Sequence, residues 1–457
     1  MNTTIKIAEI LRKNGYESYI VGGAVRDFVL GQVPHDIDFA TNATPDEIEI
    51  AMKKAGVFTT DVGKKFGTIV AYLDGEEFEI TTYRKDGAIL DGRHPDGVTY
   101  AKTIEEDLSR RDFTMNAMAM NPFTKEIVDP FGGRVDLKGK RLRFVGDTKD
   151  RINEDALRIA RAVRFAIKYG LNLSLEDEKT IKENASLMKN VSKERKTDEL
   201  KKILTCGGKI APLFERMPEV MLQIVPELKP TVGCTQKNPY HHHDVYNHIL
   251  ATVDGVESNK FEIKLAALLH DIGKPDCKMT IEESYDEYEH FLGHPSKSKE
   301  ICEDVFNNSL VVTKKERDLV TLLVEHHDTN YFQTEKQLKK AIAKFGEPFL
   351  RDLVVLQYAD MIDHIIPPDM TEEKKRRWYT PKEEIEEMFE NINAGSNCLS
   401  LRDLAIKGND LKNLGYEGKE IGDALKQMLD AVIDGVVKNE RDDLIQFLEK
   451  DDLEKDL

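Results

Sequence analysis

The sequence contains few of the residues that build disulfide frameworks, zinc ribbons or membrane spans. It has five cysteines and one tryptophan in 457 residues. The cysteines are scattered without C-x-x-C spacing and their number is odd, which argues against a disulfide framework and a zinc ribbon. No apolar run reaches the roughly 18 residues that span a bilayer, and the N-terminal MNTTIKIAEI lacks a signal-peptide pattern. We therefore expect a cytoplasmic protein without a membrane partner.

Positive charge is also in deficit. The chain has 66 Lys and Arg residues against 83 Asp and Glu residues, a formal net charge of −17. This balance argues against nonspecific nucleic-acid binding over the whole surface, so an RNA partner would require basic residues gathered on one face. Hydrophobic residues make up 40% and charged residues 33% of the sequence, typical of a helix-rich globular protein. The length exceeds what one hydrophobic core usually serves, so we expect two to four domains.

A glycine pair near the N-terminus interrupts an apolar segment in YIVGGAVRDFVLGQVPHDIDF, which begins at Tyr19. The strand-like Tyr-Ile-Val run ends at Gly22 and Gly23, and an amphipathic segment with Arg26 and Asp27 follows. Glycines without Cβ let backbone N–H groups approach phosphates, and a helix N-terminus offers further donors. The pattern favours a phosphate-binding turn, although a simple glycine turn gives the same letters.

Two aspartates follow in the same stretch, Asp36 and Asp38. Because strand side chains alternate, we expect both carboxylates on one face of a second strand, with Ile37 on the other. Neighbouring carboxylates repel unless a hard divalent cation joins them, and Mg²⁺ is often bound by one or two carboxylates plus substrate phosphates. An Asx-rich loop without a metal is the alternative.

The order GGxxRD and then DxD resembles the nucleotidyltransferase signature of class II tRNA CCA-adding enzymes and their bacterial poly(A) polymerase relatives. The resemblance extends over roughly residues 20–200 through several ordered motifs. It implies that Asp36 and Asp38 are catalytic residues that hold Mg²⁺. It also implies that the first glycine motif binds nucleotide through Gly22, Gly23, Arg26 and Asp27.

A hairpin is predicted beyond the aspartates. Residues 68–73 form an apolar strand, Asp74-Gly75 is a hairpin turn, and residues 77–83 form the return strand. Phe78 and Ile80 face the core in this return strand, so Glu79 faces the other side. If the strand lies beside the one that carries the aspartates, Glu79 is a third metal-binding carboxylate; otherwise it is a solvated side chain.

Residues 83–98, YRKDGAILDGRHPDGV, mix charges with three glycines and a proline and have no regular period. They are typical of a mobile loop. In the resembling family, members that add the terminal adenosine have a flexible loop here, so its presence implies adenosine addition. Arg93-His94 departs from the family's paired arginines.

The segment 106–117, EDLSRRDFTMNA, is similar to the family's RRDFTxNA motif. Arginines such as Arg111 can neutralise triphosphate oxygens. Asp112 and Asn116 are four residues apart, so they can share a helix face and contact ribose hydroxyls. Without the neighbouring motifs, a charged helix start with ordinary surface pairs would be the simpler interpretation.

A later segment, residues 146–165, is similar to the family's nucleotide-recognition pattern. Residues 153–155 suit a helix start, and arginines recur every third residue at Arg158, Arg161 and Arg164. Cytosine and adenine both present an exocyclic amine beside an unprotonated ring nitrogen. Asp155 can accept from the amine and Arg158 can donate to the ring nitrogen, so protein side chains can act as the template. Ordinary ion pairs on a solvated helix are the alternative; the following segment 194–200 resembles the motif that orients this helix.

Histidines concentrate in a separate region between residues 241 and 360. The pattern looks like an HD phosphohydrolase domain, and adjacent His-Asp on a helix supplies nitrogen and oxygen ligands to one metal. The resemblance implies a mononuclear core and a second metal position, with a divalent transition metal such as Ni²⁺, Mn²⁺ or Fe²⁺. Its implied activity is phosphoester hydrolysis by metal-activated water, with Lys274 near phosphate. A domain that only braces the RNA body is the alternative. The expected ligands are His248, His270, Asp271 and Asp360 for the first ion, and His294 and His326 for the second.

The predicted fold class is α+β: a polymerase-β-like nucleotidyltransferase head of mixed α/β structure, followed by a mainly helical neck, HD body and tail. The predicted domains are a head at 1–145, a base-recognition neck at 146–215, an HD domain at 216–365 and a tail at 366–457. The tail holds the basic run 372–379 and a helix–glycine turn–helix pattern at 406–422, either of which can contact RNA phosphate or serve packing and linkage.

The predicted function is addition of C, C and A from CTP and ATP to the tRNA 3′ end, with pyrophosphate released. Within the same class, an A-adding enzyme and a poly(A) polymerase are alternatives. From other classes, the alternatives are an HD phosphohydrolase with a nucleotide-sensing head and a noncatalytic RNA chaperone, which the paired carboxylates disfavour. The sequence leaves the oligomeric state open.

Overall fold

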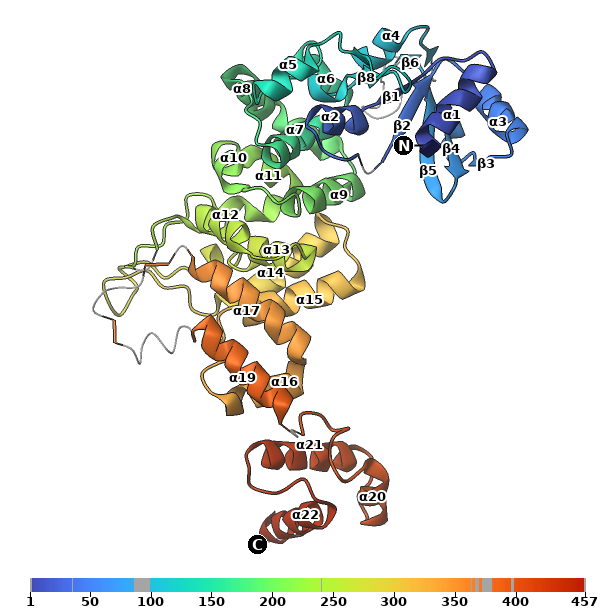
Figure 1. Ribbon diagram of the computed structural model, residues 1–457. Helices are drawn as coiled ribbons and strands as arrows, with labels where there is room; N and C mark the ends of the chain where they lie inside the picture. Colours follow the sequence, from blue (N-terminus) through green and yellow to red (C-terminus); the bar gives the residue numbers. More distant parts are fainter. Residues whose placement is uncertain are drawn as a thin grey trace. The chain divides into compact units, whose positions relative to one another are not determined.

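The computed structural model describes residues 2–34, 36–85, 99–239, 241–362, 364–365, 370–371, 380–395 and 398–455 (Figure 1). The chain divides into two compact units. The first is Met1–Lys229 with Asp304–Val312, and the second is Pro230–Glu303 with Thr313–Leu457. Most of the expected mobile loop, residues 86–98, and the basic run 372–379 lie outside the described residues.

A seven-stranded mixed sheet forms the centre of the first unit's N-terminal part, with strand order β3-β4-β5-β2-β1-β8-β9. Strands β2 and β5 run parallel, and the other neighbours are antiparallel. Strands β6 and β7 make a separate two-stranded sheet. The strand bounds are β1 Ser18–Val21, β2 Asp38–Thr41, β3 Phe58–Thr60, β4 Thr68–Leu73, β5 Glu76–Thr82, β6 Arg84–Lys85, β7 Thr99–Tyr100, β8 Ala119–Met120 and β9 Ile127–Val128.

The predicted hairpin is present as β4 and β5. Asp74 and Gly75 between them have φ angles of 52° and 83°, which a hairpin turn of this kind requires. The return strand lies beside β2, with Glu79 in register with Asp38. The prediction that both aspartates belong to one strand is wrong in one respect: β2 begins at Asp38, so the exposed Asp36 precedes the strand.

Helices of the head pack on this sheet. Helix α3 begins with the predicted capping box of Thr44 and Glu47 and buries Ile48, Ala51 and Met52. These apolar residues recur at helical spacing, which is why the segment packs one face against the strands. The helices and 3₁₀ turns of the head are α1 Asn2–Lys13, α2 Gly23–Val29, α3 Pro45–Lys54, η1 Lys64–Phe66, α4 Ile104–Ser109, η2 Thr114–Asn116 and α5 Gly133–Lys138.

The rest of the first unit is helical. Helix α6 ends at Glu154, Asp155 adopts an extended conformation with φ −151°, and α7 begins at Leu157. The helix therefore starts two residues after Asp155. The Asp155 side chain accepts a hydrogen bond from the Leu157 N–H. The helices here are α6 Thr148–Glu154, α7 Leu157–Tyr169, α8 Leu175–Asn184, η3 Ala185–Asn190, α9 Lys193–Leu204, α10 Ala211–Arg216 and α11 Pro218–Ile224; η4 Pro226–Thr231 crosses into the second unit.

The second unit contains a helical bundle in which α12, α13, α15 and α17 pack on one another. Its C-terminal part has a separate apolar cluster built from α20, α21 and α22, with Leu411, Met428 and Leu444 buried. Within the described residues, no helix is both long enough and apolar enough to cross a membrane. The bounds are α12 Val245–Gly255, α13 Phe261–Leu269, η5 Pro275–Cys277, α14 His294–Asn308, α15 Lys314–His326, α16 Glu335–Phe345, α17 Glu347–Met361, α19 Lys382–Ala394, α20 Gly408–Asn413, α21 Lys419–Ile433 and α22 Arg441–Lys455.

Candidate functional site

A cavity of about 500 Å³ lies in the first unit and is lined by the sheet, the 110–116 segment and helix α7. Nine of the predicted nucleotide-binding residues line it, together with the Asp38 and Glu79 carboxylates. Those nine are Gly22, Gly23, Arg26, Arg111, Asp112, Asn116, Asp155, Arg158 and Arg161. Residues that are far apart in the sequence thus contribute to one pocket.

The acidic edge of the cavity is formed by two parallel strands. Asp38 is the first residue of β2 and lies in register with Glu79 of β5. The pKa of Asp38 is raised to about 6, mainly by burial and then by the nearby Glu79 and Asp36 carboxylates, against the opposing effect of Arg111. A divalent cation would relieve this repulsion, and oxygen-only donors suit a hard ion. The carboxylates therefore fit the metal that the sequence predicts.

Gly22 leaves room beside the cavity. Its φ angle is 68°, which favours glycine, and a Cβ atom built there would lie 3.0 Å from an Nη atom of Arg111. A larger residue would therefore strain the backbone and displace a pocket arginine. The prediction that glycine at this turn lets the backbone approach phosphate therefore has a structural basis.

A chain of polar contacts joins three segments along the cavity wall. Arg26 donates to the Asn116 side-chain oxygen at 2.8 Å, and the Asn116 amide donates to Asp112 at 3.1 Å. Arg161 then donates to the other oxygen of Asp112. Burial alone would raise the pKa of Asp112, but Arg161 and Asn116 outweigh it and lower the pKa. The expected shared helix face is wrong, because α4 ends at Ser109 and Thr114–Asn116 is a 3₁₀ turn; the two side chains nevertheless meet.

The two residues predicted to read the base both line the cavity. Asp155 accepts from the Leu157 N–H at 3.1 Å and from Arg195 of α9 at 2.7 Å, so its carboxylate is held in place. Arg158 donates to the backbone oxygens of Arg151 and Arg110, both at 3.1 Å. It also pairs with Glu154 at 2.5 Å. These contacts fix the position of the guanidinium at the wall.

Three predicted residues do not line this cavity: Asp27, Asp36 and Arg164. Asp27 forms an ion pair at 2.8 Å with Arg26, which does line the cavity. Arg164 is buried and pairs with Glu199 of α9 at 2.5 Å. The three-residue arginine spacing rotates Arg164 away from Arg158 by the helical drift, and its side chain forms a helix–helix ion pair. Its nucleotide contact stays a prediction.

A second constellation lies in the second unit and lines a cavity of about 440 Å³. His248 is 2.8 Å from Asp360 and 3.4 Å from Asp271, and His270 is 3.2 Å from Asp271. The four residues predicted for the first metal therefore meet. His248, His270 and Asp271 offer ligand atoms within 4.8 Å of one another, as do Asp271, His294 and His327.

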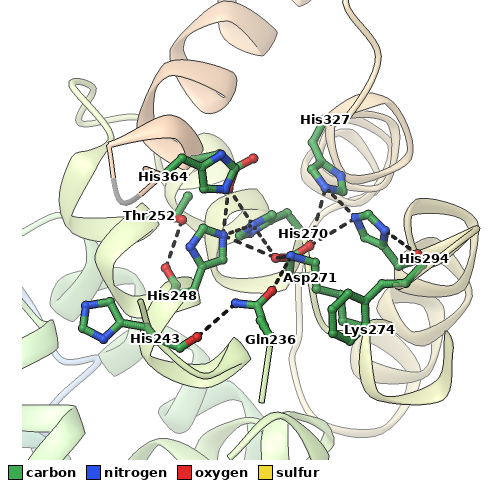
Figure 2. Close-up of polar contacts among 12 residues, drawn as sticks. Gln236, His243, His248, Thr252, His270, Asp271, Lys274, His294, His327 and His364 are labelled. Atoms are coloured by element: carbon green, nitrogen blue, oxygen red, sulfur yellow. Dashed lines mark hydrogen bonds and ion pairs between the residues drawn. The ribbon is translucent and has the colours of Figure 1, made fainter. Parts of the chain in front are cut away.

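Backbone contacts fix the tautomers of three histidines of this cluster, His270, His294 and His327, whose side chains gather round Asp271 in Figure 2. The Nδ1 atoms of His270, His294 and His327 lie 2.8–2.9 Å from carbonyl oxygens three residues earlier in the chain. A carbonyl can only accept, so each Nδ1 bears the proton and each Nε2 is available to the cluster. The Nε2 atoms of His270 and His248 are 3.4 Å apart, and those of His294 and His327 are 3.2 Å apart.

In the His294–His327 pair both Nδ1 atoms bear the proton, so the two facing Nε2 lone pairs favour a proton or a metal ion between them. Burial would lower the pKa of His270, but Asp271 and Asp360 raise it to about 9. The carboxylates thus favour a proton or a metal ion on the histidines, although Lys274 also neutralises part of the Asp271 charge at 2.6 Å. Mixed imidazole and carboxylate donors suit a divalent transition metal. The donor set fits the metal centre that the histidine pattern predicts.

His326, predicted for the second metal, is not part of this cluster; His327 occupies that position. The Nδ1 atom of His326 lies 2.9 Å from the Tyr331 hydroxyl, and its ring packs against Phe345. Adjacent helical side chains point about 100° apart, so one residue of the pair faces the cluster and the other faces away. The His-His pair gave no signal for choosing between them.

Two further histidines were not among the predicted ligands. His241 and His364 offer nitrogen atoms within 4.8 Å of each other and of a nitrogen of His248. His364 lies four residues after Asp360, beyond the end of α17, with its Nε2 3.8 Å from the Asp360 carboxylate. This four-residue spacing within QYADMIDH was the available signal.

Four family models match successive parts of the chain. They are the "Poly A polymerase head domain" at residues 18–143, the "RNA and SrmB- binding site of polymerase A" at 170–231, the "HD domain" at 240–365 and "tRNA nucleotidyltransferase domain 2" at 370–448. The first covers most of the sheet and the acidic edge of the head cavity. The third covers the histidine cluster.

Curated relatives are similar over the first part of the chain. The CCA-adding enzyme of Geobacillus thermodenitrificans is 47% identical over 194 residues, which cover 42% of this chain and 47% of that protein. The enzyme of Geobacillus stearothermophilus is 45% identical over 205 residues, 45% of this chain and 49% of that protein. The chain thus spans about half the length of the curated relatives it matches.

Solved structures extend the likeness along the whole chain. The Bacillus stearothermophilus CCA-adding enzyme in complex with CTP has a TM-score of 0.72 at 26% identity, covering 100% of this chain and 98% of that one. The Thermotoga maritima CCA-adding enzyme complexed with tRNA has a TM-score of 0.59 at 21% identity, covering 98% and 94%, and supports the fold alone. These matches show that the chain contains a part similar to the poly(A) polymerase head domain and a part similar to the HD domain, and that its fold resembles that of CCA-adding enzymes along its length.

Proposed function

We propose that the protein adds C, C and A to the 3′ end of tRNA, using CTP and ATP and releasing pyrophosphate. The observation that carries this proposal is one cavity in which Asp38 and Glu79 face Asp155 and Arg158. The relatives that match the first half of the chain are called CCA-adding enzymes, and one similar structure is a CTP complex. A role on tRNA implies a cytoplasmic location.

Base selection follows from the donors and acceptors at the α7 end of the cavity. Asp155 accepts from the exocyclic amine shared by cytosine and adenine, and Arg158 donates to the neighbouring ring nitrogen. Uracil and guanine present the opposite pattern and would leave these groups unpaired. Arg195 holds Asp155 in place, which limits reorientation toward the wrong base.

Phosphate and ribose are bound by the rest of the wall. Arg26 and Arg111 can neutralise triphosphate oxygens, while Asp112 and Asn116 can hold the ribose hydroxyls. Asp36 and Asp38, with Glu79, would hold Mg²⁺, which supplies charge neutralisation to the triphosphate and acidifies the terminal tRNA hydroxyl. We propose that these residues belong to a head domain at 1–145. Asp155 and Arg158, which select the base, belong to a neck domain at 146–215.

The test combines active-site variants with sequencing of reaction products. tRNAs lacking zero to three terminal nucleotides are incubated with CTP and ATP, singly and together, and their 3′ ends are sequenced. We expect growth to CCA and then arrest; A-only addition or long A tails would instead favour the A-adding or poly(A) polymerase alternatives. Asp36→Ala and Asp38→Ala should abolish transfer while tRNA still binds, and retained transfer would contradict the proposed role.

The second unit supports a second activity. We infer that the cluster at residues 216–365 hydrolyses phosphoesters with a divalent transition metal such as Ni²⁺, Mn²⁺ or Fe²⁺, because its imidazole and carboxylate donors converge beside a cavity. Lys274 lines that cavity, and its Nζ pairs with Asp271 at 2.6 Å and donates to Gln236 at 2.8 Å, so binding phosphate would require it to exchange one of these partners. Phosphate release from model esters under Ni²⁺ or Mn²⁺ tests this, with Asp271→Asn as the variant expected to lose it. Equal release by the variant would show a contaminating activity.

A further inference from the structure

A three-nitrogen group lies beside the predicted metal centre of the second unit. His241 precedes α12, His248 lies within α12, and His364 follows α17. One nitrogen of each lies within 4.8 Å of the others. The His241 and His364 rings are 4.4 Å apart at 87°, and those of His248 and His364 are 5.4 Å apart at 16°. Figure 2 shows His364 beside His248, away from His294 and His327.

The backbone holds this group together. His241 and His364 form a β-bridge, which joins the start of α12 to the end of α17. Upstream of α12, the Gln236 amide donates to the His243 carbonyl, and Lys274 donates to the Gln236 side-chain oxygen at 2.8 Å. The helices α12 and α17, which pack on each other, and the hydrogen-bonded segment 236–243 before α12 thus fix the positions of the rings. The arrangement does not depend on a mobile surface side chain.

A second observation indicates that the group has a ligand. The Nδ1 atom of His241 is buried and makes no hydrogen bond within the described residues. A buried polar atom without a partner costs about 1–3 kcal/mol, so such atoms usually bind something. Ordinary packing of aromatic rings would explain the ring contacts but not this unpaired nitrogen.

We propose that His241, His248 and His364 form a nitrogen-rich seat for a transition-metal ion next to the hydrolytic centre. Ligands at the usual metal–nitrogen distance of about 2.1 Å lie at most about 4 Å apart, so side-chain shifts below 1 Å bring these nitrogens onto one ion. His248 is shared with the seat formed by His270 and Asp271.

Donor chemistry decides which seat a given metal prefers. The first seat offers imidazole and carboxylate, which suits Mn²⁺, whereas the His241 seat offers three imidazoles, with the Asp360 carboxylate 2.8 Å from His248 and 3.8 Å from His364. Ni²⁺ binds nitrogen donors far more strongly than Mn²⁺ does, by the usual order of divalent affinities. The inference therefore extends the proposed hydrolase by assigning metal selectivity to His241 and His364. It does not depend on nucleotide addition by the first unit.

The test is calorimetric titration of the full-length, chelator-treated protein with Ni²⁺ and with Mn²⁺, in excess Mg²⁺ so that the oxygen-donor site of the head is filled. For His241→Ala and His364→Ala we expect Ni²⁺ affinity to fall by at least about tenfold while Mn²⁺ affinity stays within about threefold. His242→Ala is the matched control, because His242 is exposed and adjacent. His248→Ala should lower the affinity for both Ni²⁺ and Mn²⁺.

X-ray absorption of the Ni²⁺-loaded protein gives an independent readout, with fewer imidazole ligands expected in the His241→Gln and His364→Gln variants. Unchanged Ni²⁺ affinity and unchanged imidazole number would overturn the proposal, and so would equal weakening of Ni²⁺ and Mn²⁺. Phosphate release under Mn²⁺ separates failure of the hydrolase proposal from failure of the three-histidine metal seat. If the hydrolase proposal fails, that release is absent in the wild type; if only the nitrogen seat fails, it persists and Ni²⁺ binding is unaffected by the variants.

Discussion

Asp38 and Glu79 face each other across two parallel strands, although 40 other residues separate them in the chain. Because both side chains line the head cavity, Glu79 contributes charge where the metal would bind. We predict that Glu79→Ala lowers the rate of nucleotide addition by about 10- to 100-fold, the usual effect of weakening metal support. Steady-state addition of C to tRNA at several Mg²⁺ concentrations measures the loss.

Glu77→Ala is the control for that prediction. Glu77 lies on the same face of β5 and is exposed, but it does not line the cavity. The Glu79 variant should recover partly at high Mg²⁺, whereas the Glu77 variant should behave as wild type throughout. Identical behaviour of the two variants would mean that Glu79 is merely a solvated side chain.

Arg158 is the other residue whose side chain gives a distinct prediction. It lies on the cavity wall with its guanidinium held by two backbone oxygens and Glu154. Losing one bidentate base contact costs about 1–3 kcal/mol, so Arg158→Ala should reduce the preference for CTP over UTP by about 5- to 150-fold. Competition between the two nucleotides at a tRNA end measures it. Lys168→Ala, exposed on the same helix, should leave the preference unchanged.

The sequence predicts which types of residue form the two sites. It does not predict which of two adjacent residues points into a site, or how far a side chain turns round its helix. The aspartate and glycine motifs at 22–38 have fixed local spacing, so their grouping followed from the chain itself. His326 and His327 are chemically identical neighbours, and only the packing of α15 turns His327 inward. Arg164 shares its spacing with Arg158 and Arg161, yet one further turn of α7 directs it to Glu199. Such choices depend on tertiary contacts.

At the scale of elements, α7 and α9 are joined by the buried Arg164–Glu199 pair, which is only 11% and 3% exposed. Removing one partner leaves a buried charge, which typically costs about 3–5 kcal/mol. We predict that Glu199→Ala lowers the unfolding midpoint of the first unit. Urea titration followed by circular dichroism measures the change.

Two variants sharpen this prediction. Arg164→Met combined with Glu199→Leu removes both charges and should unfold at a higher urea concentration than Glu199→Ala alone. Lys202→Ala, exposed near the end of α9, should have almost no effect. If the double variant is as unstable as the single one, shape rather than charge holds these helices together.

Secondary structure was predictable where the local signals agreed. The capping box of α3, the strand at Thr68–Leu73 and the Asp74-Gly75 turn follow from neighbouring residues alone. The break at Asp155 was not predicted, because residues 153–155 suit a helix start by composition. In the structure Asp155 leaves the helical conformation, and its carboxylate is held by Arg195, 40 residues later. A contact at that separation leaves no local signature.

For the whole molecule, the charge of the chain differs from the charge of its head cavity. The chain carries a formal net charge of −17, yet the cavity is lined by six arginines and four carboxylates. The arginines outnumber the carboxylates there, which favours an anionic ligand in this pocket of an otherwise acidic chain. This distribution is consistent with the localised basic face that the composition required of an RNA-binding protein.

The two units also differ in donor chemistry, which predicts separate responses to metal removal. The head offers carboxylate oxygens alone at Asp36, Asp38 and Glu79, whereas the cluster in the second unit combines imidazole nitrogens with carboxylates. Oxygen donors suit Mg²⁺ and mixed donors suit transition metals. After chelation of the full-length protein, Mg²⁺ alone should restore nucleotide addition, and phosphate release should return only when Mn²⁺ or Ni²⁺ is added. The two assays run on one preparation measure this directly.

Reciprocal variants complete the comparison. Asp38→Ala should lose addition and keep phosphate release, and Asp271→Asn should do the reverse, because each change removes a ligand from only one donor set. Loss of both activities in either variant, with both units still folded by circular dichroism, would mean that the metal sites are coupled. Retention of phosphate release under Mg²⁺ alone would contradict the assignment of the histidine cluster to a transition metal, since imidazole donors bind Mg²⁺ poorly.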